Sequence, residues 1–268
     1  MSQIKFGCQT YTWQMSYDKY CNAMDHIMDV VASSHFAGVE AEVCMLGKYR
    51  TEPAKLAEAF ARRKLTYGAI CLVCDWLGPT ETDAERAEAD RVIKFLRYFP
   101  GTLLALCQMP QKDRANLESR QKNCIQCVNA IGRRAADAGI VTGFHPNSPP
   151  GSVFRIESDY HLLLDKLDTK VVGFAPDAGH IARGGIDVVK LFREYVSVIH
   201  HVHFKDMTAA GAWALMGEGS IDFPTITADL RDAGYHGWIM IEDESPLAEV
   251  DPDAATRQNG EYLKTRLA

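Results

Sequence analysis

Short apolar segments alternate with longer amphipathic segments along the whole chain. The short segments are rich in β-branched and aromatic residues and are predicted to be strands. Several are almost continuously apolar, which is typical of strands that are covered on both faces. Eight strands are predicted, at residues 4–11, 38–43, 65–73, 103–109, 140–145, 171–177, 198–204 and 237–243.

The segments between these strands repeat their apolar residues every three or four positions, which predicts helices. They cover residues 17–36, 52–64, 83–99, 116–139, 158–168, 185–196, 223–234 and 254–267. Gly139 and Gly234 end two of them, as glycine commonly does after a helix. Eight strand–helix units in about 250 residues predict an α/β protein, with a single (β/α)8 barrel domain over residues 1–268. A doubly wound open sheet is the alternative, but its usual glycine-rich phosphate motifs, GxGxxG and GxxxxGK[ST], are absent from the sequence.

Composition narrows the class of protein. With 47% hydrophobic residues, 24% charged residues and a formal net charge of -6, the chain has globular composition and lacks the basic excess of nucleic-acid-binding proteins. The opening MSQIKFGCQTYTW does not resemble a signal peptide, and no apolar stretch is long enough to span a bilayer. We therefore expect a cytoplasmic protein without nucleic-acid or membrane partners.

The eight cysteines lie mostly within apolar segments, which favours buried thiols over disulfides. Cys71 and Cys74 form one CxxC pair, but in a strand they point to opposite faces. Cys124 and Cys127 form a second pair within a predicted helix. We interpret both pairs as packing residues rather than as a zinc site.

Four potential metal ligands stand at the ends of consecutive predicted strands. They are His145, Asp177, His203 and Glu242. The carboxyl ends of barrel strands form the active-site rim, so these side chains are expected to converge there. Two imidazoles and two carboxylates would suit Mn²⁺, Co²⁺, Zn²⁺, Fe²⁺ or Mg²⁺, with Mn²⁺ or Co²⁺ favoured.

Each of these residues also has an alternative role. A histidine at a strand end can be an ordinary surface or core residue, Asp177 can cap the following helix, and Glu242 can be one of several solvated carboxylates. Their coincidence on four consecutive strands favours the metal. His201 is predicted to lie one layer deeper than His203, hydrogen-bonded to a neighbour. Glu40 and Glu42 lie on the second predicted strand, and the sequence leaves open which of them reaches the pocket.

Over nearly its whole length, and most clearly from 140 to 265, the chain resembles the xylose-isomerase-like TIM barrels, also called sugar phosphate isomerases/epimerases, and among them the inosose (2-keto-myo-inositol) dehydratases. The resemblance rests on GFHPN, APDAGHIARGG, VHFKDM, GEGSIDFP and GYHGWIMIEDESP. It implies a divalent metal on His145, Asp177, His203 and Glu242. The isomerase and epimerase branches usually carry Glu where this chain has His145. The dehydratase-like branch carries an HPH-type motif there, from which Asn147 departs.

The expected chemistry begins with removal of a proton α to a carbonyl of a keto-sugar or keto-cyclitol, which leaves an enediolate. Glu242 or Glu157 could accept this proton. Lys205 could donate a proton or hold the oxyanion, unless it only pairs with Asp206 or Glu242, and His180 could act as an acid or bind a hydroxyl. The predicted substrate-binding residues are Trp13, Asn147, Arg183 and Glu157, and Tyr11 and Trp76 could add to an aromatic wall.

Loss of water, as in a lyase, is the favoured outcome, with isomerisation or epimerisation as alternatives. Metal-assisted hydrolysis of nucleic acid, as in the endonuclease-IV-like relatives, would need a basic groove that the acidic charge disfavours. A barrel that binds a sugar without turnover is the non-enzyme hypothesis. A small sugar or cyclitol is the expected partner, and a homo-oligomer remains open.

Overall fold

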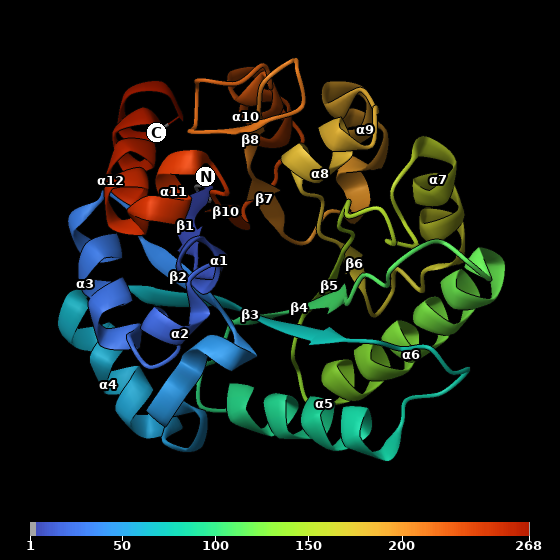
Figure 1. The fold of residues 1–268 in the computed structure, drawn as a ribbon. Coiled ribbons are helices and arrows are strands. Elements are labelled where there is room, and N and C mark those ends of the chain that lie inside the picture. The colour runs from blue at the N-terminus through green and yellow to red at the C-terminus, as the bar shows by residue number, and fades with distance from the viewer. Residues whose placement is uncertain (1–3, 268) are drawn as a thin grey trace.

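A parallel sheet of eight strands forms a barrel at the centre of the protein, and helices surround it (Figure 1). The computed structural model describes residues 4–267. The barrel strands are β1 (Lys5–Gln9), β2 (Gly38–Glu42), β3 (Thr66–Cys74), β4 (Leu103–Gln108), β5 (Thr142–His145), β6 (Gly173–Phe174), β7 (Val202–Phe204) and β10 (Trp238–Ile241). All eight predicted strands are therefore confirmed.

The strand order shows how the barrel closes. Strands β1 to β6 pair in sequence, and β10 pairs with both β1 and β7. Two isolated parallel bridges, Phe174 with Ile199 and Asp177 with His203, connect the remaining edges. The second bridge lies beyond β6 because Pro176 has no amide hydrogen to continue the ladder. It brings two predicted metal ligands side by side.

The principal outer helices follow the strands in alternation. They are α3 (Met24–Ser33), α4 (Pro53–Arg63), α5 (Asp83–Leu96), α6 (Leu117–Asp137), α7 (Glu157–Lys166), α9 (Val188–Tyr195), α10 (Phe223–Asp232) and α12 (Pro252–Tyr262). Shorter helical segments are α1 (Tyr11–Gln14), α2 (Tyr17–Tyr20), α8 (Ala178–Arg183), α11 (Pro246–Val250), η1 (Val43–Thr51), η2 (Val196–Val198) and η3 (Leu263–Leu267). The helix predicted over 17–36 is divided into α2 and α3 by a turn that contains Asn22, a residue that favours turns.

Local sequence signals set several helix boundaries. The Thr82 side chain accepts a hydrogen bond from the Glu85 amide, and the Glu85 carboxylate accepts one from the Thr82 amide, which forms a capping box before α5. Gly139 and Gly234 have positive φ after α6 and α10, which confirms both predicted helix ends. A short hairpin of β8 (Asp206–Met207) and β9 (Trp213–Ala214) follows β7 at the active-site end of the barrel.

The core lies between the barrel and its helices, with fully buried aromatic side chains such as Phe144, Phe174 and Phe204. All eight cysteines are free thiols. Neither CxxC pair belongs to a group of potential metal ligands within the described part of the chain. Among residues 4–267, no helix is both long and apolar enough to cross a membrane.

Candidate metal centre and active site

A cavity of about 270 Å³ opens at the carboxyl ends of the barrel strands. Gln9 from β1, Glu42 from β2, His145 from β5 and His203 from β7 all line it. Residues far apart in the sequence meet here because parallel strands end at the same rim. The cavity is therefore the candidate active site.

Three of the four predicted metal ligands, His145, His203 and Glu242, line this cavity, and Asp177 lies against His145. His145 Nε2 lies 3.6 Å from Asp177 Oδ2, and His203 Nδ1 lies 3.5 Å from a Glu242 carboxylate oxygen. Asp177, His203 and Glu242 each offer a ligand atom, and these three atoms lie within 4.8 Å of one another. His145 joins Asp177 and His180 in a second such group. Asp177 belongs to both groups.

Unpaired polar atoms test whether these residues fit a metal. Both ring nitrogens of His145, Asp177 Oδ2 and His203 Nδ1 are buried and have no hydrogen-bond partner among residues 4–267. Buried polar atoms are normally paired, so unpaired atoms that face a common space call for an ion or a ligand. Imidazole nitrogens and carboxylate oxygens are suitable ligands for a divalent transition metal. The site fits such an ion.

The charges at the centre also favour a cation. Burial opposes protonation of His203, but the neighbouring carboxylates, chiefly Glu40, outweigh it and raise its pKa to about 10. Burial likewise opposes protonation of His145, while its contact with Asp177 raises the pKa to about 9. The carboxylates thus favour positive charge at this centre, which a bound metal ion would supply with both imidazoles neutral.

Asp177 has both roles that were considered for it. One carboxylate oxygen, Oδ1, accepts a hydrogen bond from the His180 amide at 2.7 Å and caps α8. The other, Oδ2, is the unpaired atom that faces His145. Burial raises the pKa of this carboxyl, but the charge of Lys205 and the contact with His145 hold it well below its usual range. The hydrogen bond from the His180 amide therefore orients Asp177, an ionised carboxylate, toward His145.

Lys205 is a fully buried cation beside the proposed ligands. Its Nζ donates to Glu242 and to Glu244, each at 2.6 Å, and lies 3.1 Å from His180 Nε2. Despite burial of Glu242, the Lys205 charge lowers the pKa of this carboxyl to about 2. Of the two predicted ion pairs, the one with Glu242 is present, whereas Asp206 accepts backbone amides from Met207, Gly217, Gly219 and Ile221.

His180 is held as a neutral imidazole. Its Nδ1 lies 2.8 Å from the Ser148 hydroxyl, and burial together with the Lys205 charge lowers its pKa to about 3. It lines the cavity, and both of its ring nitrogens have protein partners there, Ser148 and Lys205.

Two predicted substrate-binding residues line the cavity. Asn147 donates from Nδ2 to the Gln108 carbonyl at 2.8 Å. Arg183 lies with its guanidinium 4.2 Å from the centre of the Trp213 ring, and both residues line the opening. Trp213 therefore supplies an aromatic surface that the sequence did not reveal.

The structure corrects the other two predicted substrate contacts. Trp13 is completely buried, donates to Asp253 at 2.8 Å and does not line the cavity. Glu157 begins α7 on the outer surface, where it forms a half-exposed ion pair with Lys190, so it is not a rim base. Trp76 is also buried outside the cavity, whereas Tyr11 does line it.

Glu42 is a cavity carboxyl without a cationic partner among the described residues. It accepts a hydrogen bond from Gln14 Nε2 at 2.9 Å. Burial, with the charges of Glu242 and Glu40, raises its pKa from an ordinary 4.5 to about 7. Glu42 can therefore exchange a proton near neutral pH.

Glu42→Gln should stabilise the metal-free protein near pH 8 by about 1–3 kcal/mol, as a pKa shift is a difference in folding free energy. The folded protein holds the Glu42 proton more tightly than the unfolded chain. Wild-type stability should thus fall as pH rises from about 4.5 to about 7. Urea denaturation near pH 4 and pH 8 measures the difference. The exposed Glu157→Gln is the control, and a gain from Glu42→Gln that is equal at both pH values would contradict the prediction.

A sequence profile of the xylose isomerase-like TIM barrel family matches residues 28–266, and the chain belongs to this family. Inosose dehydratase of Clostridium botulinum (strain Alaska E43 / Type E3) is 30% identical over 157 residues, which cover 52% of each chain. Inosose dehydratase of Geobacillus thermodenitrificans (strain NG80-2) is 26% identical over 158 residues, again 52% of each. The chain thus spans about half the length of these curated relatives.

Solved structures share the whole barrel. The 3-keto-D-glucoside 4-epimerase of E. coli aligns with a TM-score of 0.77 and 17% identity, over 98% of this chain and 100% of that one. The IOLI protein, solved with a zinc atom, aligns with a TM-score of 0.77 and 13% identity, over 96% of each chain. At these identities the likeness shows the fold alone, and it confirms the predicted TIM barrel.

Proposed function

We propose that this chain is a divalent-metal-dependent lyase that removes water from a keto-cyclitol or a related keto-sugar. The observation that carries the proposal is the set of unpaired buried ligand atoms of His145, Asp177 and His203 beside Glu242 in the cavity. The inosose dehydratase relatives support the substrate class.

His145, Asp177, His203 and Glu242 would hold the ion. When bound, a divalent metal supplies Lewis acidity that favours negative charge on a substrate carbonyl oxygen. Mn²⁺ or Co²⁺ is the proposed ion, with Zn²⁺, Fe²⁺ or Mg²⁺ as alternatives.

The geometry favours Glu42 over Glu242 as the group that takes the α-proton. Glu242 is ionised with a pKa near 2 and already accepts from Lys205, so it is a weak base. Glu42 is not paired with a cation, and its pKa of about 7 matches proton transfer near neutral pH. We therefore assign Glu242 as a metal ligand and Glu42 as the base that accepts the α-proton.

Loss of water needs a second group. As the α-proton moves to Glu42, the electrons of the C–H bond form a C=C bond, and the bond to the β-hydroxyl breaks. The departing oxygen takes one proton and leaves as water. We propose Lys205 as the donor of that proton, because its ammonium lies 2.6 Å from both Glu242 and Glu244, which line the cavity.

Isomerisation or epimerisation is the second candidate function. The same first proton transfer serves all three outcomes, and the structural likeness to a 3-keto-D-glucoside 4-epimerase is consistent with the shared scaffold. Return of the proton to the neighbouring carbon gives isomerisation, and return to the opposite face gives epimerisation. A barrel that binds sugar without turnover would need neither Glu42 nor Lys205.

A single experiment separates these outcomes. Protein loaded with Mn²⁺ or Co²⁺ is incubated in D₂O with inososes and keto-sugars, and products are followed by NMR and mass spectrometry. We expect loss of water from an inosose, and Glu42→Gln should lose this reaction while retaining the metal. Deuterium at the α-carbon of an intact skeleton would instead indicate an isomerase or epimerase. Absence of metal from the wild type, with no exchange into any substrate, would refute the proposed function.

A further inference from the structure

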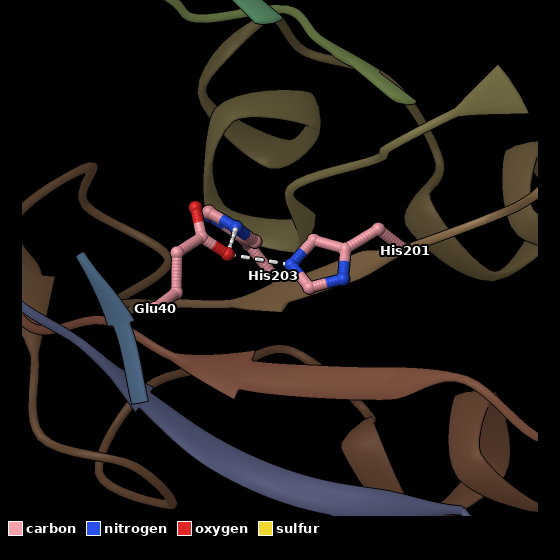
Figure 2. A group of neighbouring side chains, drawn as sticks. All are labelled: Glu40, His201 and His203. Carbon is pink, nitrogen blue, oxygen red and sulfur yellow. Dashed lines mark hydrogen bonds and ion pairs between the residues drawn. The ribbon is translucent and has the colours of Figure 1, made fainter. Parts of the chain in front are cut away.

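A fully buried carboxylate, Glu40, lies next to the proposed metal centre and has no part in the chemistry described above. Its Oε2 lies 2.5 Å from His201 Nε2 and 2.9 Å from His203 Nε2. Figure 2 shows both imidazoles, which come from the β7 segment, turned toward the Glu40 carboxylate on β2. One oxygen thus accepts two hydrogen bonds across the barrel.

This contact determines which nitrogen of His203 faces the ligands. A neutral imidazole has one N–H donor and one free lone pair. If Nε2 donates to Glu40, the lone pair is on Nδ1, and this atom lies 3.5 Å from Glu242 and has no hydrogen-bond partner. The His145 ring, whose centroid lies 4.4 Å from that of His203, packs against the same imidazole.

His201 is the second histidine that contacts Glu40. Like Glu40, it is fully buried, and its Nε2 shares the carboxylate oxygen with His203. The second hydrogen bond restrains the carboxylate, since turning it toward one imidazole would break its contact with the other. The predicted hydrogen bond of His201 to a neighbour is therefore present, and the neighbour is Glu40.

We propose that Glu40 is a positioning residue for the metal centre, which fixes His203 so that Nδ1 binds the ion. The inference rests on the proposed metal site. Carboxylates that accept from the second nitrogen of a ligand histidine hold its tautomer and ring orientation, and their loss typically costs about 10–100-fold in metal affinity. The competing view is that Glu40 only neutralises two buried histidines.

Two substitutions of the same size on one strand separate these views. Glu40→Asp keeps the charge but shortens the side chain by one methylene, so it loses contact with the imidazoles. Glu42→Asp makes the same change two residues away on β2, on a carboxylate that does not contact His203. Mn²⁺ affinity is measured by isothermal titration calorimetry near pH 8, where circular dichroism checks folding.

We expect Glu40→Asp to bind Mn²⁺ about 10–100-fold more weakly than wild type, with Glu42→Asp within about threefold. Equal affinity of Glu40→Asp and wild type would overturn the inference and leave the metal site intact. Wild type that binds no Mn²⁺ would overturn both this inference and the proposed function.

A second measurement covers the case in which Glu40→Asp does not fold. In the wild type loaded with diamagnetic Zn²⁺, long-range ¹H–¹⁵N spectra of the histidines report the protonated nitrogen of each ring. The inference expects Nε2 of His203 to carry the proton and Nδ1 to carry the metal. The reverse assignment would overturn it.

Discussion

Asp177→Asn is expected to abolish tight metal binding and, with it, the proposed activity. Asp177 Oδ2 is a buried, unpaired carboxylate oxygen that faces His145 and lies within reach of His203 and Glu242. The asparagine keeps the shape and can still cap α8 through its carbonyl oxygen, but it removes the negative charge. Because loss of an outer partner alone costs about 10–100-fold, loss of a direct ligand should weaken Mn²⁺ affinity by more than about 100-fold. Calorimetry and metal analysis after dialysis measure this change.

Asp187→Asn is a matched control for this variant. Asp187 caps α9 by accepting from the Lys190 amide at 3.0 Å, as Asp177 caps α8, but it is exposed and does not line the cavity. Its substitution should change the Mn²⁺ affinity by less than about threefold, because only the cap is altered. If both variants bound Mn²⁺ as wild type does, Asp177 would be a helix cap and no more.

The convergence of Asp177, His203 and Glu242 could be predicted from the sequence because it follows from topology. Once eight parallel strands are recognised, the residues at their carboxyl ends must share one rim. The isolated bridge between Asp177 and His203 shows that these two strand ends are neighbours at the rim. The sequence left open which of Glu40 and Glu42 reaches the pocket; in the structure Glu42 lines it and Glu40 contacts His203.

Residues on loops and short helices could not be placed in this way. Tyr11 and Trp13 are close in sequence, yet one lines the cavity and the other donates to Asp253, 240 residues further along the chain. Glu157 follows a loop after β5 whose path leads to the outer surface. Trp213 reaches the opening because the β8–β9 hairpin folds back over it, and no periodic pattern marks a two-residue strand.

The relative depth of Glu40 and Glu42 could not be predicted from the sequence pattern. Glu40 and Glu42 lie on the same face, but Glu40 is buried against two histidines and Glu42 lines the cavity. The difference is one layer of the barrel, which depends on strand tilt and register with β1 and β3. This difference assigns one glutamate to a structural contact and the other to the substrate side.

Lys205→Met is expected to destabilise the metal-free protein by about 3–5 kcal/mol, the usual cost of removing one partner of a buried ion pair. Lys205 Nζ is fully buried and lies 2.6 Å from Glu242, 2.6 Å from Glu244 and 3.8 Å from Asp177. Without the ammonium, these carboxylates repel one another in a site shielded from water. A divalent cation should relieve that repulsion, so Mn²⁺ should raise the melting temperature more in Lys205→Met than in wild type.

Thermal denaturation with and without Mn²⁺ measures both effects, and Lys190→Met is the control. Lys190 is paired with Glu157 at 3.4 Å, and both side chains are more than half exposed at 66% and 51%, so its loss should change stability by less than about 0.5 kcal/mol. A metal-free Lys205→Met as stable as wild type would mean that the carboxylates already share protons. A Mn²⁺-dependent gain no larger than in wild type would mean that the ion does not bind among them. The proposal requires both the loss and the enhanced rescue, because the ammonium and the ion would neutralise the same cluster of carboxylates.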